Sequence, residues 1–413
     1  MTDAPRRSPH EGKPRLRILL AADTFAPEIN GAASFIARLA AGLAARGHDV
    51  HIAAPAFDNR RRGPQRETHE GQELTVHRIY SWRWYPHPWL RFALPWRIEQ
   101  NSRKILDLVE PDVVHFQSHI VIGRGMTIAG LERGIRLIGT NHVMPENLLD
   151  YTAVIPRFLK PAAVRAAWAA ADRSFSRAER ATAPTQKAAA YLEQHTSVRN
   201  VLAISCGLDT HRYVPNMTVG DDNLIVFLGR LAPEKQIDVL LRGFARLDPA
   251  LNARLELVGG GDEDTHLKRL ATHLGVLDRV TFAGYVDDAY LRDALTRAKV
   301  FAIASIAELQ SISTMEAMAS GLPVVAADAM ALPHLVHDGE NGYLFEPGND
   351  AELAEKLTAV LTMPHDELLA FKEESLRIVQ AHDIERTLDT FESLYRGETV
   401  LEGVGTPAKA KHS

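Results

Sequence analysis

Two series of short apolar runs, each run followed by helical periodicity, constrain the fold of this chain more than any other feature. The first run, residues 16–22 (LRILLAA), is too short for a helix and is typical of a buried parallel strand. Apolar residues then recur at helical spacing from Ile36 through Leu39 to Leu43. Repeated strand–helix–strand units predict a parallel sheet covered by helices on both faces. Later strands of this series are expected at residues 49–54, 113–116, 137–139, 181–183 and 201–204.

A second, complete series begins at residue 224 (LIVFLGR). The 413 residues exceed what one hydrophobic core usually organises, so two domains are expected. We predict an α/β fold of two Rossmann-like, doubly wound domains, with ligands in the crevice between them. The predicted parts are a disordered tail (1–14), an N-terminal domain (15–205), a C-terminal domain (206–382), a helix expected to cross back to the first domain (383–398) and a second disordered tail (399–413).

The composition excludes several classes of protein. Hydrophobic residues make up 46% and charged residues 24% of the chain, which excludes collagenous and mostly disordered proteins. Cys206 is the single cysteine, so neither an intramolecular disulfide nor a cysteine-based zinc site can form. Apolar runs stay well short of the roughly 18 residues of a membrane span, and the polar, basic start lacks a signal-peptide core. We expect a cytoplasmic protein, soluble or peripheral to a membrane.

The two halves of the chain differ in charge. Residues 1–205 hold 28 Lys and Arg against 19 Asp and Glu, a net charge of +9, whereas residues 206–413 hold 19 against 33, a net charge of −14. A cationic half suits an anionic surface such as nucleic acid or acidic lipid, but arginines scattered over a solvated face produce the same count.

Standard nucleotide and metal fingerprints are absent from the sequence. The chain has no G-x-x-x-x-G-K-[ST] and no G-x-G-x-x-G after its first strand, so ATPase and dinucleotide-binding functions lose their main support. H-E-x-x-H is absent too. The D-x-D at Asp262 and Asp264 is better explained by acids in the first turn of a helix than by a metal site. These motifs therefore give no support for a metal site or a dinucleotide cofactor.

The stretch 308–326 (ELQSISTMEAMASGLPVVA) is the strongest candidate for chemistry. It follows a buried strand and opens a helix, whose N-terminus favours anions. Glu308 precedes the helix and can accept hydrogen bonds from sugar hydroxyls, whereas Glu316 lies inside it and can accept them from a ribose diol. The alternative is that both glutamates lie on the surface. The apolar strand that follows this stretch argues against that alternative. The amides expected to hold a diphosphate are those of Gln310, Ser311 and Ile312.

Four motifs carry a resemblance to a known family. They are ELQSISTMEAMASGLPVV in the stretch above, GRLAPEK at residues 229–235, ISCGLD at 204–209 and HDGENGYLFEPGN at 337–349. Together they resemble glycosyltransferase family four, over residues 16–395. This resemblance implies the GT-B fold, with two Rossmann-like domains and a deep cleft, and transfer of sugar from a nucleotide sugar with retention of anomeric configuration.

The resemblance also implies roles for single residues. Arg230 and Lys235 would neutralise the donor's diphosphate without a metal, because a leaving nucleoside diphosphate gains negative charge. Glu308 would orient the transferred sugar and Glu316 the ribose. The other donor-binding positions that it implies are Gly229, Val286, and Asn30 and Gly31 in the turn PEINGAAS, where Ala32 stands in place of the family's second glycine.

A histidine after a strand, His142 in GTNH, matches the family's cleft histidine, which is directed at the sugar or its developing charge. No residue has the features of an obligate nucleophile. In the mechanism generally proposed for the family the acceptor attacks from the face that the diphosphate leaves, so the protein positions groups and supplies charge. Asp23 and His119 lie at strand ends and are candidates for contact with the acceptor, whereas His115 is better explained as structural.

An aromatic and basic segment, residues 80–97 (YSWRWYPHPWLRFALPWR), lies in the cationic half and contains no acid. Such a mixture suits a membrane interface, with rings at headgroup level and cations near anionic lipid; tryptophans packed between helices are the alternative. Residues 151–168 form a second segment of this kind. The tryptophans expected to contact a membrane are Trp82, Trp84, Trp89 and Trp96.

The acceptor is inferred from the motifs and the basic segments together. They are most similar to the branch of the family that glycosylates diacylglycerol or related membrane lipids. We expect transfer of glucose or mannose, from UDP-glucose or GDP-mannose, to a lipid at the inner face of the cell membrane. Phosphatidylinositol mannosylation, a soluble sugar or sugar-phosphate acceptor, and nucleotide-sugar 2-epimerisation are the alternatives. Nucleic acid is not expected, because no recognised motif accompanies the charge.

Overall fold

The computed structural model describes residue 10 and residues 12–28, 30–83, 91–146, 156–218, 222–401 and 403–404. The chain divides into two compact units. Unit 1 comprises Met1–Cys206 and Glu385–Val404, and unit 2 comprises Gly207–Ile384 and Gly405–Ser413. Unit 1 is therefore built from two separate stretches of the chain.

Unit 1 contains an eight-stranded sheet in the order β10-β9-β8-β7-β1-β2-β4-β3. Neighbouring strands are parallel except β3 and β4. The apolar runs form inner strands because both faces are covered, and residues 18–21 of β1 are fully buried. The strands are β1 (Arg17–Ala21), β2 (Asp49–Pro55), β3 (Gly63–His69), β4 (Gln72–Ile79), β7 (Val113–Phe116), β8 (Arg136–Thr140), β9 (Arg180–Ala183) and β10 (Leu202–Ala203); β5 (Ser81–Arg83) and β6 (Arg91–Ala93) form a separate antiparallel pair.

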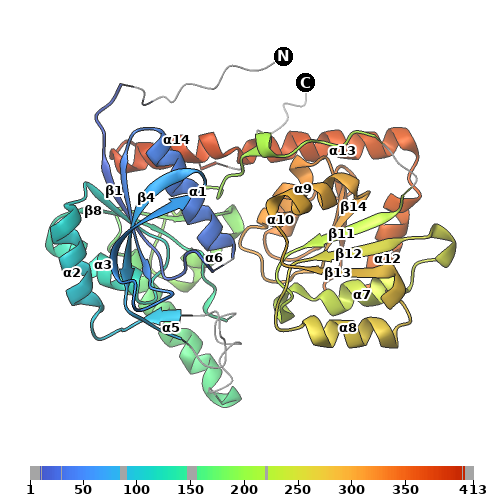
Figure 1. The fold of residues 1–413 in the computed structure, drawn as a ribbon, viewed down its shortest axis with the longest axis horizontal. Coiled ribbons are helices and arrows are strands. Elements are labelled where there is room, and N and C mark those ends of the chain that lie inside the picture. The colour runs from blue at the N-terminus through green and yellow to red at the C-terminus, as the bar shows by residue number, and fades with distance from the viewer. Residues whose placement is uncertain are drawn as a thin grey trace. The chain divides into compact units, whose positions relative to one another are not determined.

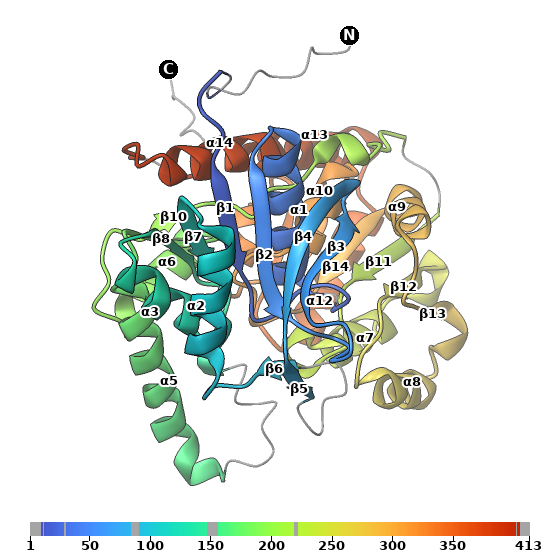
Figure 2. The same cartoon turned by 60° about the vertical axis from the view of Figure 1, so that its left-hand side comes forward.

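Helices cover both faces of this sheet: α1 lies on one face, and α2 and α3 lie on the other (Figure 1, Figure 2). α1 buries Phe35, Ile36 and Leu39, as its periodicity predicts. The Asn30 side chain caps it by accepting a hydrogen bond from the Ala33 amide. The helices are α1 (Gly31–Ala45), α2 (Ile98–Val109), α3 (Ile122–Glu132), α5 (Lys160–Phe175) and α6 (Gln186–His195), with a 3-10 turn at Arg157–Leu159.

Unit 2 contains a six-stranded parallel sheet in the order β13-β12-β11-β14-β15-β16, with helices on both faces (Figure 1). Its strands are β11 (Leu224–Leu228), β12 (Arg254–Val258), β13 (Val280–Gly284), β14 (Val300–Ile303), β15 (Val324–Ala327) and β16 (Gly342–Phe345). Its helices are α7 (Ile237–Ala245), α8 (Asp264–His273), α9 (Asp288–Arg297), α10 (Ile312–Ala319), α11 (Leu332–Leu335), α12 (Asp350–Leu361) and α13 (His365–Val379), and its 3-10 turns are Thr210–Arg212, Pro233–Lys235, Pro249–Leu251, Leu277–Arg279 and Gln380–His382.

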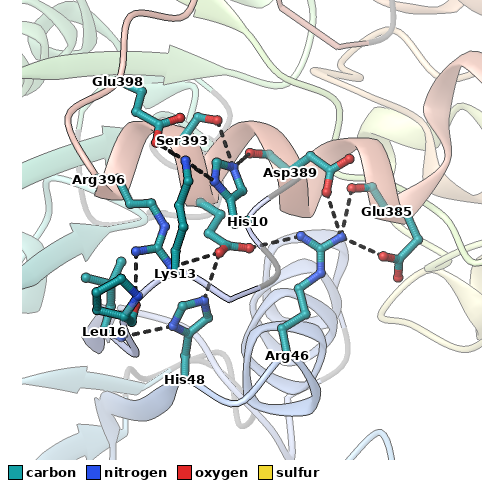
Figure 3. A network of polar contacts seen from close by, with 12 residues as sticks. His10, Lys13, Leu16, Arg46, His48, Glu385, Asp389, Ser393, Arg396 and Glu398 are labelled. Carbon is teal, nitrogen blue, oxygen red and sulfur yellow. Dashed lines mark hydrogen bonds and ion pairs between the residues drawn. The ribbon is translucent and has the colours of Figure 1, made fainter. Parts of the chain in front are cut away.

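The last helix, α14 (Ile384–Tyr395), packs against unit 1 through ion pairs and through a close approach to α1 (Figure 3). Gly42 of α1 permits a close approach, because a Cβ at this position would lie 2.6 Å from Leu388 Cδ1. The Arg46 guanidinium, just after α1, contacts three carboxylates that share one face of α14, because their positions are spaced i, i+4 and i+7. They are Glu385 at 2.6 Å, Asp389 at 2.9 Å and Glu392 at 3.2 Å.

The stretch before β1 joins the same network, so the disorder expected for residues 1–14 is wrong for its last part (Figure 3). The His10 ring lies 3.0 Å from Ser393 Oγ, and Lys13 Nζ donates to Glu398 Oε1 at 2.5 Å. The disorder expected for residues 399–413 is wrong at Val404, which forms a parallel β-bridge with Ile204, just after β10. Residues 1–9 and 405–413 lie outside the described residues.

Candidate functional site

The strand order of unit 2 reverses between β11 and β14, which are neighbours in the sheet although β12 and β13 separate them in sequence. The carboxyl ends of neighbouring parallel strands meet at one edge, and doubly wound sheets bind ligands at such a switch point. GRLAPEK begins at the end of β11, and the stretch from Glu308 follows β14. The two loops touch: the Glu234 carbonyl accepts hydrogen bonds from the Ile306 amide at 3.1 Å and the Ser305 hydroxyl at 3.2 Å.

Four charged side chains of these loops form two ion pairs. Lys235 Nζ donates to Glu308 Oε1, and Arg230 Nη2 donates to Glu234 Oε1 at 2.7 Å. The Glu308 residue is 8% exposed, and the ammonium offsets the cost of burying its charge. Arg230, Lys235 and Glu308, which the sequence analysis selected, thus lie in one region of unit 2, together with Glu234, which it did not select.

The loop after β12 approaches the same region through glycines. Gly229 has a φ of 155°, in the range that favours glycine. A Cβ on Gly259 would lie 2.0 Å from the Gly229 carbonyl oxygen, and one on Gly261 would lie 2.2 Å from the Leu231 carbonyl oxygen. Larger residues would therefore push the two loops apart. Val286, after the neighbouring strand β13, is half-buried.

Helix α10 begins at this edge of the sheet. The Ser311 hydroxyl caps the helix, so the amides of Gln310, Ser311 and Ile312 lie at its N-terminus, where the helix dipole favours an anion. Glu316 lies in the second turn and accepts a hydrogen bond from the Tyr213 hydroxyl at 2.9 Å. Tyr213 thereby orients one carboxylate that the sequence analysis assigned to a ribose.

In unit 1, Asp23 follows β1 and binds the N-terminus of α3. Its carboxylate accepts hydrogen bonds from the amides of Val121 at 3.1 Å and Ile122 at 2.7 Å, and from the Ser118 hydroxyl. Burial raises the pKa of Asp23 above its ordinary value, although these hydrogen bonds oppose the rise. Both oxygens are bonded within unit 1, which favours a structural role over contact with an acceptor.

The turn between β1 and α1 holds a carboxyl group that the sequence analysis did not select. Glu28 Oε2 accepts a hydrogen bond from the Thr24 hydroxyl at 2.6 Å, and Thr24 Oγ1 accepts one from the Asn30 side chain at 2.7 Å. Glu28 is thus linked to the residue that caps α1 and precedes Gly31. Burial raises the pKa of Glu28 to about 7, although the hydrogen bond from Thr24 and two neighbouring arginines lower it.

We expect Glu28→Gln to remove a pH-dependent loss of stability. Because the pKa of Glu28 is above its ordinary value of 4.5 in the folded chain, the free energy of unfolding falls as the pH rises from 4.5 to about 7. Glutamine does not ionise, so its free energy of unfolding does not fall over this pH range. The difference in free energy of unfolding, variant minus wild type, should therefore be larger at about pH 8 than at about pH 5, as measured by urea unfolding. Exposed Glu73→Gln is the control, and an equal pH dependence of Glu28→Gln and wild type would contradict the assignment.

His142 follows β8 and is half-buried. Its Nε2 lies 2.9 Å from Gln117 Oε1, and its ring centroid lies 5.2 Å from that of Phe35. Burial lowers the pKa of His142 to about 4, so the ring is neutral at pH 7. Gln117 was not selected from the sequence; its signal is its position directly after β7, the neighbour of β8.

Two further histidines lie in or just after β7. His119 is 5% exposed, burial lowers its pKa to about 4, and its Nδ1 has no hydrogen-bond partner within the described residues. With this pKa the His119 ring is neutral at pH 7. His115 is fully buried, as a structural polar group would be.

The aromatic segment is described only in part. Trp82 is 66% and Trp96 is 73% exposed, so neither ring is part of the hydrophobic core. Trp84 and Trp89 lie outside the described residues. Phe158, in the second aromatic segment, is 80% exposed. Within the described parts of the chain, no helix has the length and apolar character needed to cross a membrane.

One group of possible metal ligands occurs among the described residues. His337, Glu340 and Glu374 place ligand atoms within 4.8 Å of one another. Glu374 is already paired with Arg377, which opposes a cation there. The group includes no residue of the loops after β11 and β14.

Comparisons with known proteins match both units. The family model described as Glycosyltransferase Family 4 matches residues 29–212, and the model described as Glycosyl transferases group 1 matches residues 215–377. A GDP-mannose-dependent alpha-mannosyltransferase of Mycolicibacterium smegmatis is 30% identical over 341 residues, which cover 80% of this chain and 84% of that protein. Alpha-monoglucosyldiacylglycerol synthase of Acholeplasma laidlawii is 24% identical over 353 residues, which cover 81% and 86%.

Solved structures share the fold. Sucrose-phosphate synthase from Thermosynechococcus elongatus matches with a TM-score of 0.77 at 20% identity, over 92% of this chain and 99% of that chain. Two doubly wound units of this kind define the GT-B class of glycosyltransferases, as expected from the sequence. The chain belongs to glycosyltransferase family four and is a nucleotide-sugar-dependent hexosyltransferase, which confirms the resemblance that the motifs carry.

Proposed function

We propose that this enzyme transfers a hexose, with retention of anomeric configuration, from a nucleotide diphosphate sugar to a membrane lipid such as diacylglycerol or a glycolipid. The observation that carries the proposal is the meeting of Arg230, Lys235 and Glu308 at the switch point of unit 2. In the structure each cation has a carboxylate partner, Glu234 for Arg230 and Glu308 for Lys235. A sugar diphosphate suits this group because its phosphates attract the two cations and its sugar hydroxyls can donate hydrogen bonds to Glu308.

In the proposed reaction, the bond between sugar C1 and the diphosphate oxygen breaks while the acceptor oxygen bonds to C1 on the same face. The acceptor's hydroxyl proton passes to an oxygen of the departing diphosphate. Arg230 and Lys235 stabilise the charge that develops there, and the first amides of α10 add their dipoles, so the scheme requires no metal. Glu308 orients the hexose, and Glu316, held by Tyr213, accepts hydrogen bonds from the ribose.

GDP-mannose is the first donor to test. The relative that is 30% identical over most of both chains bears the name GDP-mannose-dependent alpha-mannosyltransferase, which supports mannose over the alternative of UDP-glucose. Gly229 and Val286, on neighbouring loops of unit 2, are further proposed donor contacts.

A lipid acceptor is supported by the surface of unit 1. Trp82 and Trp96 are mostly exposed and are followed in the sequence by Arg83 and Arg97, and unit 1, formed by residues 1–206 (+9) and 385–404 (−3), carries a net charge of +6. Exposed aromatic rings with cations suit the interface of an anionic membrane. The relative from Acholeplasma laidlawii is named for synthesis of a glycolipid. We therefore propose that the enzyme acts as a peripheral protein at the inner face of the cell membrane.

Replacing Trp82 and Trp96 by alanine should lower the fraction of enzyme that sediments with anionic vesicles, about tenfold or more, because each ring contributes apolar area at the interface. Hydrolysis of the donor in solution should stay unchanged. Leu277→Ala, which shortens an exposed side chain of unit 2, is the matched control. If the double variant and the control sediment equally, these rings do not contact the membrane.

The proposed function is tested by a panel of GDP-mannose, UDP-glucose, UDP-galactose and UDP-glucuronate, each with and without vesicles that contain diacylglycerol and anionic lipid. Glycolipid formed from one donor, only with vesicles, is the expected result. A transfer rate that is the same with and without vesicles would identify a soluble acceptor. Release of UDP with a free 2-epimer and no acceptor product would identify a nucleotide-sugar 2-epimerase, and either of these outcomes overturns the proposal.

A further inference from the structure

A cavity of about 750 Å³ lies at the amino edge of the unit 2 sheet, opposite the edge that holds the candidate donor site. It is lined by Leu224 and Arg254, the first residues of β11 and β12, and by Lys299, just before β14. Gly229 follows the other end of β11, roughly 16 Å away along the strand. A small molecule in this cavity would therefore not overlap a donor bound at the opposite edge.

The lining of the cavity is cationic, although unit 2 is acidic overall. Unit 2 holds 17 Lys and Arg against 28 Asp and Glu, a net charge of −11. Among the described residues, the lining cations are Arg254, Arg297, Lys299 and Lys372, and the lining carboxylates are Asp222 and Glu256. The Glu256 carboxylate already accepts hydrogen bonds from the Tyr290 hydroxyl at 2.8 Å and from Arg297 at 3.3 Å. The cavity therefore concentrates positive charge where the rest of the unit does not.

Lys372, in α13, is the buried cation of this lining. The residue is 2% exposed, and its ammonium donates a hydrogen bond to the Asn216 carbonyl at 2.8 Å. Within the parts of the chain that the structure describes, this ammonium forms no ion pair with a carboxylate. Burial and the neighbouring Lys299 ammonium lower the pKa of Lys372 to about 8, so the side chain is still mostly charged at pH 7. Burying an ammonium without a counter-ion costs free energy, which a bound anion would offset.

We propose that this cavity is a second anion site, which binds a small phosphorylated molecule at the edge of the sheet away from the donor. The phosphate pairs with the ammonium groups of Lys372 and Lys299, and the exposed Arg254 adds a guanidinium that suits phosphate oxygens. The volume lies in the range of small-molecule sites and exceeds what one phosphate needs. Asn252 and Thr281 also line the cavity, and their side chains form no hydrogen bond with another described residue, so they are available to the rest of the ligand.

Titration calorimetry of the full chain with inorganic pyrophosphate tests the site. Because the cations of the donor site also attract phosphates, the titrations use the double variant Arg230→Met with Lys235→Met as the background. In this background we expect saturable binding of one pyrophosphate per chain. Adding Lys372→Met, which keeps the length of the side chain but removes its charge, should weaken binding about 10- to 100-fold, as expected for one charge-assisted hydrogen bond. Lys268→Met is the matched control, because it removes the same charge from an exposed lysine of unit 2 outside the cavity lining.

Arg254→Met tests the same site and applies even if Lys372→Met fails to fold, because Arg254 is exposed. It should weaken pyrophosphate binding about two- to fivefold, since water screens an exposed charge. Urea unfolding gives a second readout. Pyrophosphate should raise the free energy of unfolding of the background protein, and should raise it less in either cavity variant.

Absence of saturable pyrophosphate binding in the background protein overturns the proposal. So does binding that every folded cavity variant leaves unchanged. Binding that appears only after Asp221 and Asp222 are both replaced by asparagine overturns it too, because the chain's own carboxylates would then occupy the site. None of these measurements requires hexose transfer, so the second anion site and the proposed function stand or fall separately.

Discussion

Glu308→Gln is expected to lower turnover of the donor by about 10²- to 10³-fold, the loss seen when one preorganised charged or polar group is removed from an active site. The two side chains have nearly the same shape, but the amide is uncharged and presents a donor where the carboxylate has an acceptor. It therefore binds both Lys235 and a sugar hydroxyl less well. Initial rates with the donor found in the panel measure the effect, and thermal unfolding shows that the chain stays folded.

Glu340→Gln is the matched control, because this carboxylate is exposed in unit 2 and should leave turnover unchanged. The double variant Lys235→Met with Glu308→Gln separates stability from function. Removing both charges relieves the unpaired ammonium and should restore any lost stability, while turnover stays low. Near-normal turnover of Glu308→Gln would refute the assignment of this residue to the hexose.

Arg46→Met is expected to lower the free energy of unfolding by about 3 kcal/mol, because it removes a mostly buried cation from three carboxylates of α14. The side chain of Arg46 is 12% exposed and that of Glu392 is 3% exposed, so water replaces little of the lost interaction. Urea unfolding measures the loss. Hydrogen exchange should show it as faster opening of α14 than of the strands of unit 1.

Arg246→Met provides the matched comparison in unit 2. Arg246 pairs with Asp350 at 3.0 Å, but its side chain is 55% exposed, so its loss should cost less than about 1 kcal/mol. If Arg46→Met costs no more than Arg246→Met, the charges of α14 do not hold it on unit 1, and the apolar contacts of Leu388 and Phe391 do so alone.

The inner strands were predictable because burial on both faces requires runs of apolar residues. The hairpin of β3 and β4 was not predicted. β3 (GPQRETH) alternates exposed and half-buried residues at the edge of the sheet, and its polar sequence is equally compatible with a loop. The order near His10 was not predicted for another reason: its ring contacts Asp389 and Ser393, which lie at the other end of the chain.

The candidate site was predictable where a motif follows a strand. Lys235 and Glu308 are 73 residues apart, but both follow strands that are neighbours at the switch point. Residues that contact a candidate site residue, without belonging to a motif themselves, could not be recognised in this way. Gln117 matters because β7 places it beside His142, and Tyr213 matters because its hydroxyl reaches Glu316. These contacts depend on sheet register and helix position, which composition and spacing do not determine.

Because α14 belongs to unit 1, the two units do not obtain all of their residues in chain order during synthesis. The contiguous stretch Gly207–Ile384 is synthesised before the last piece of unit 1, Glu385–Val404. Until then the early-made half lacks Phe391 and Tyr395, which are fully or almost fully buried beside Phe35 and His115. The half of the chain that is translated first therefore receives its last helix only after all of Gly207–Ile384 has been synthesised, and until then the apolar face that α14 covers has no partner.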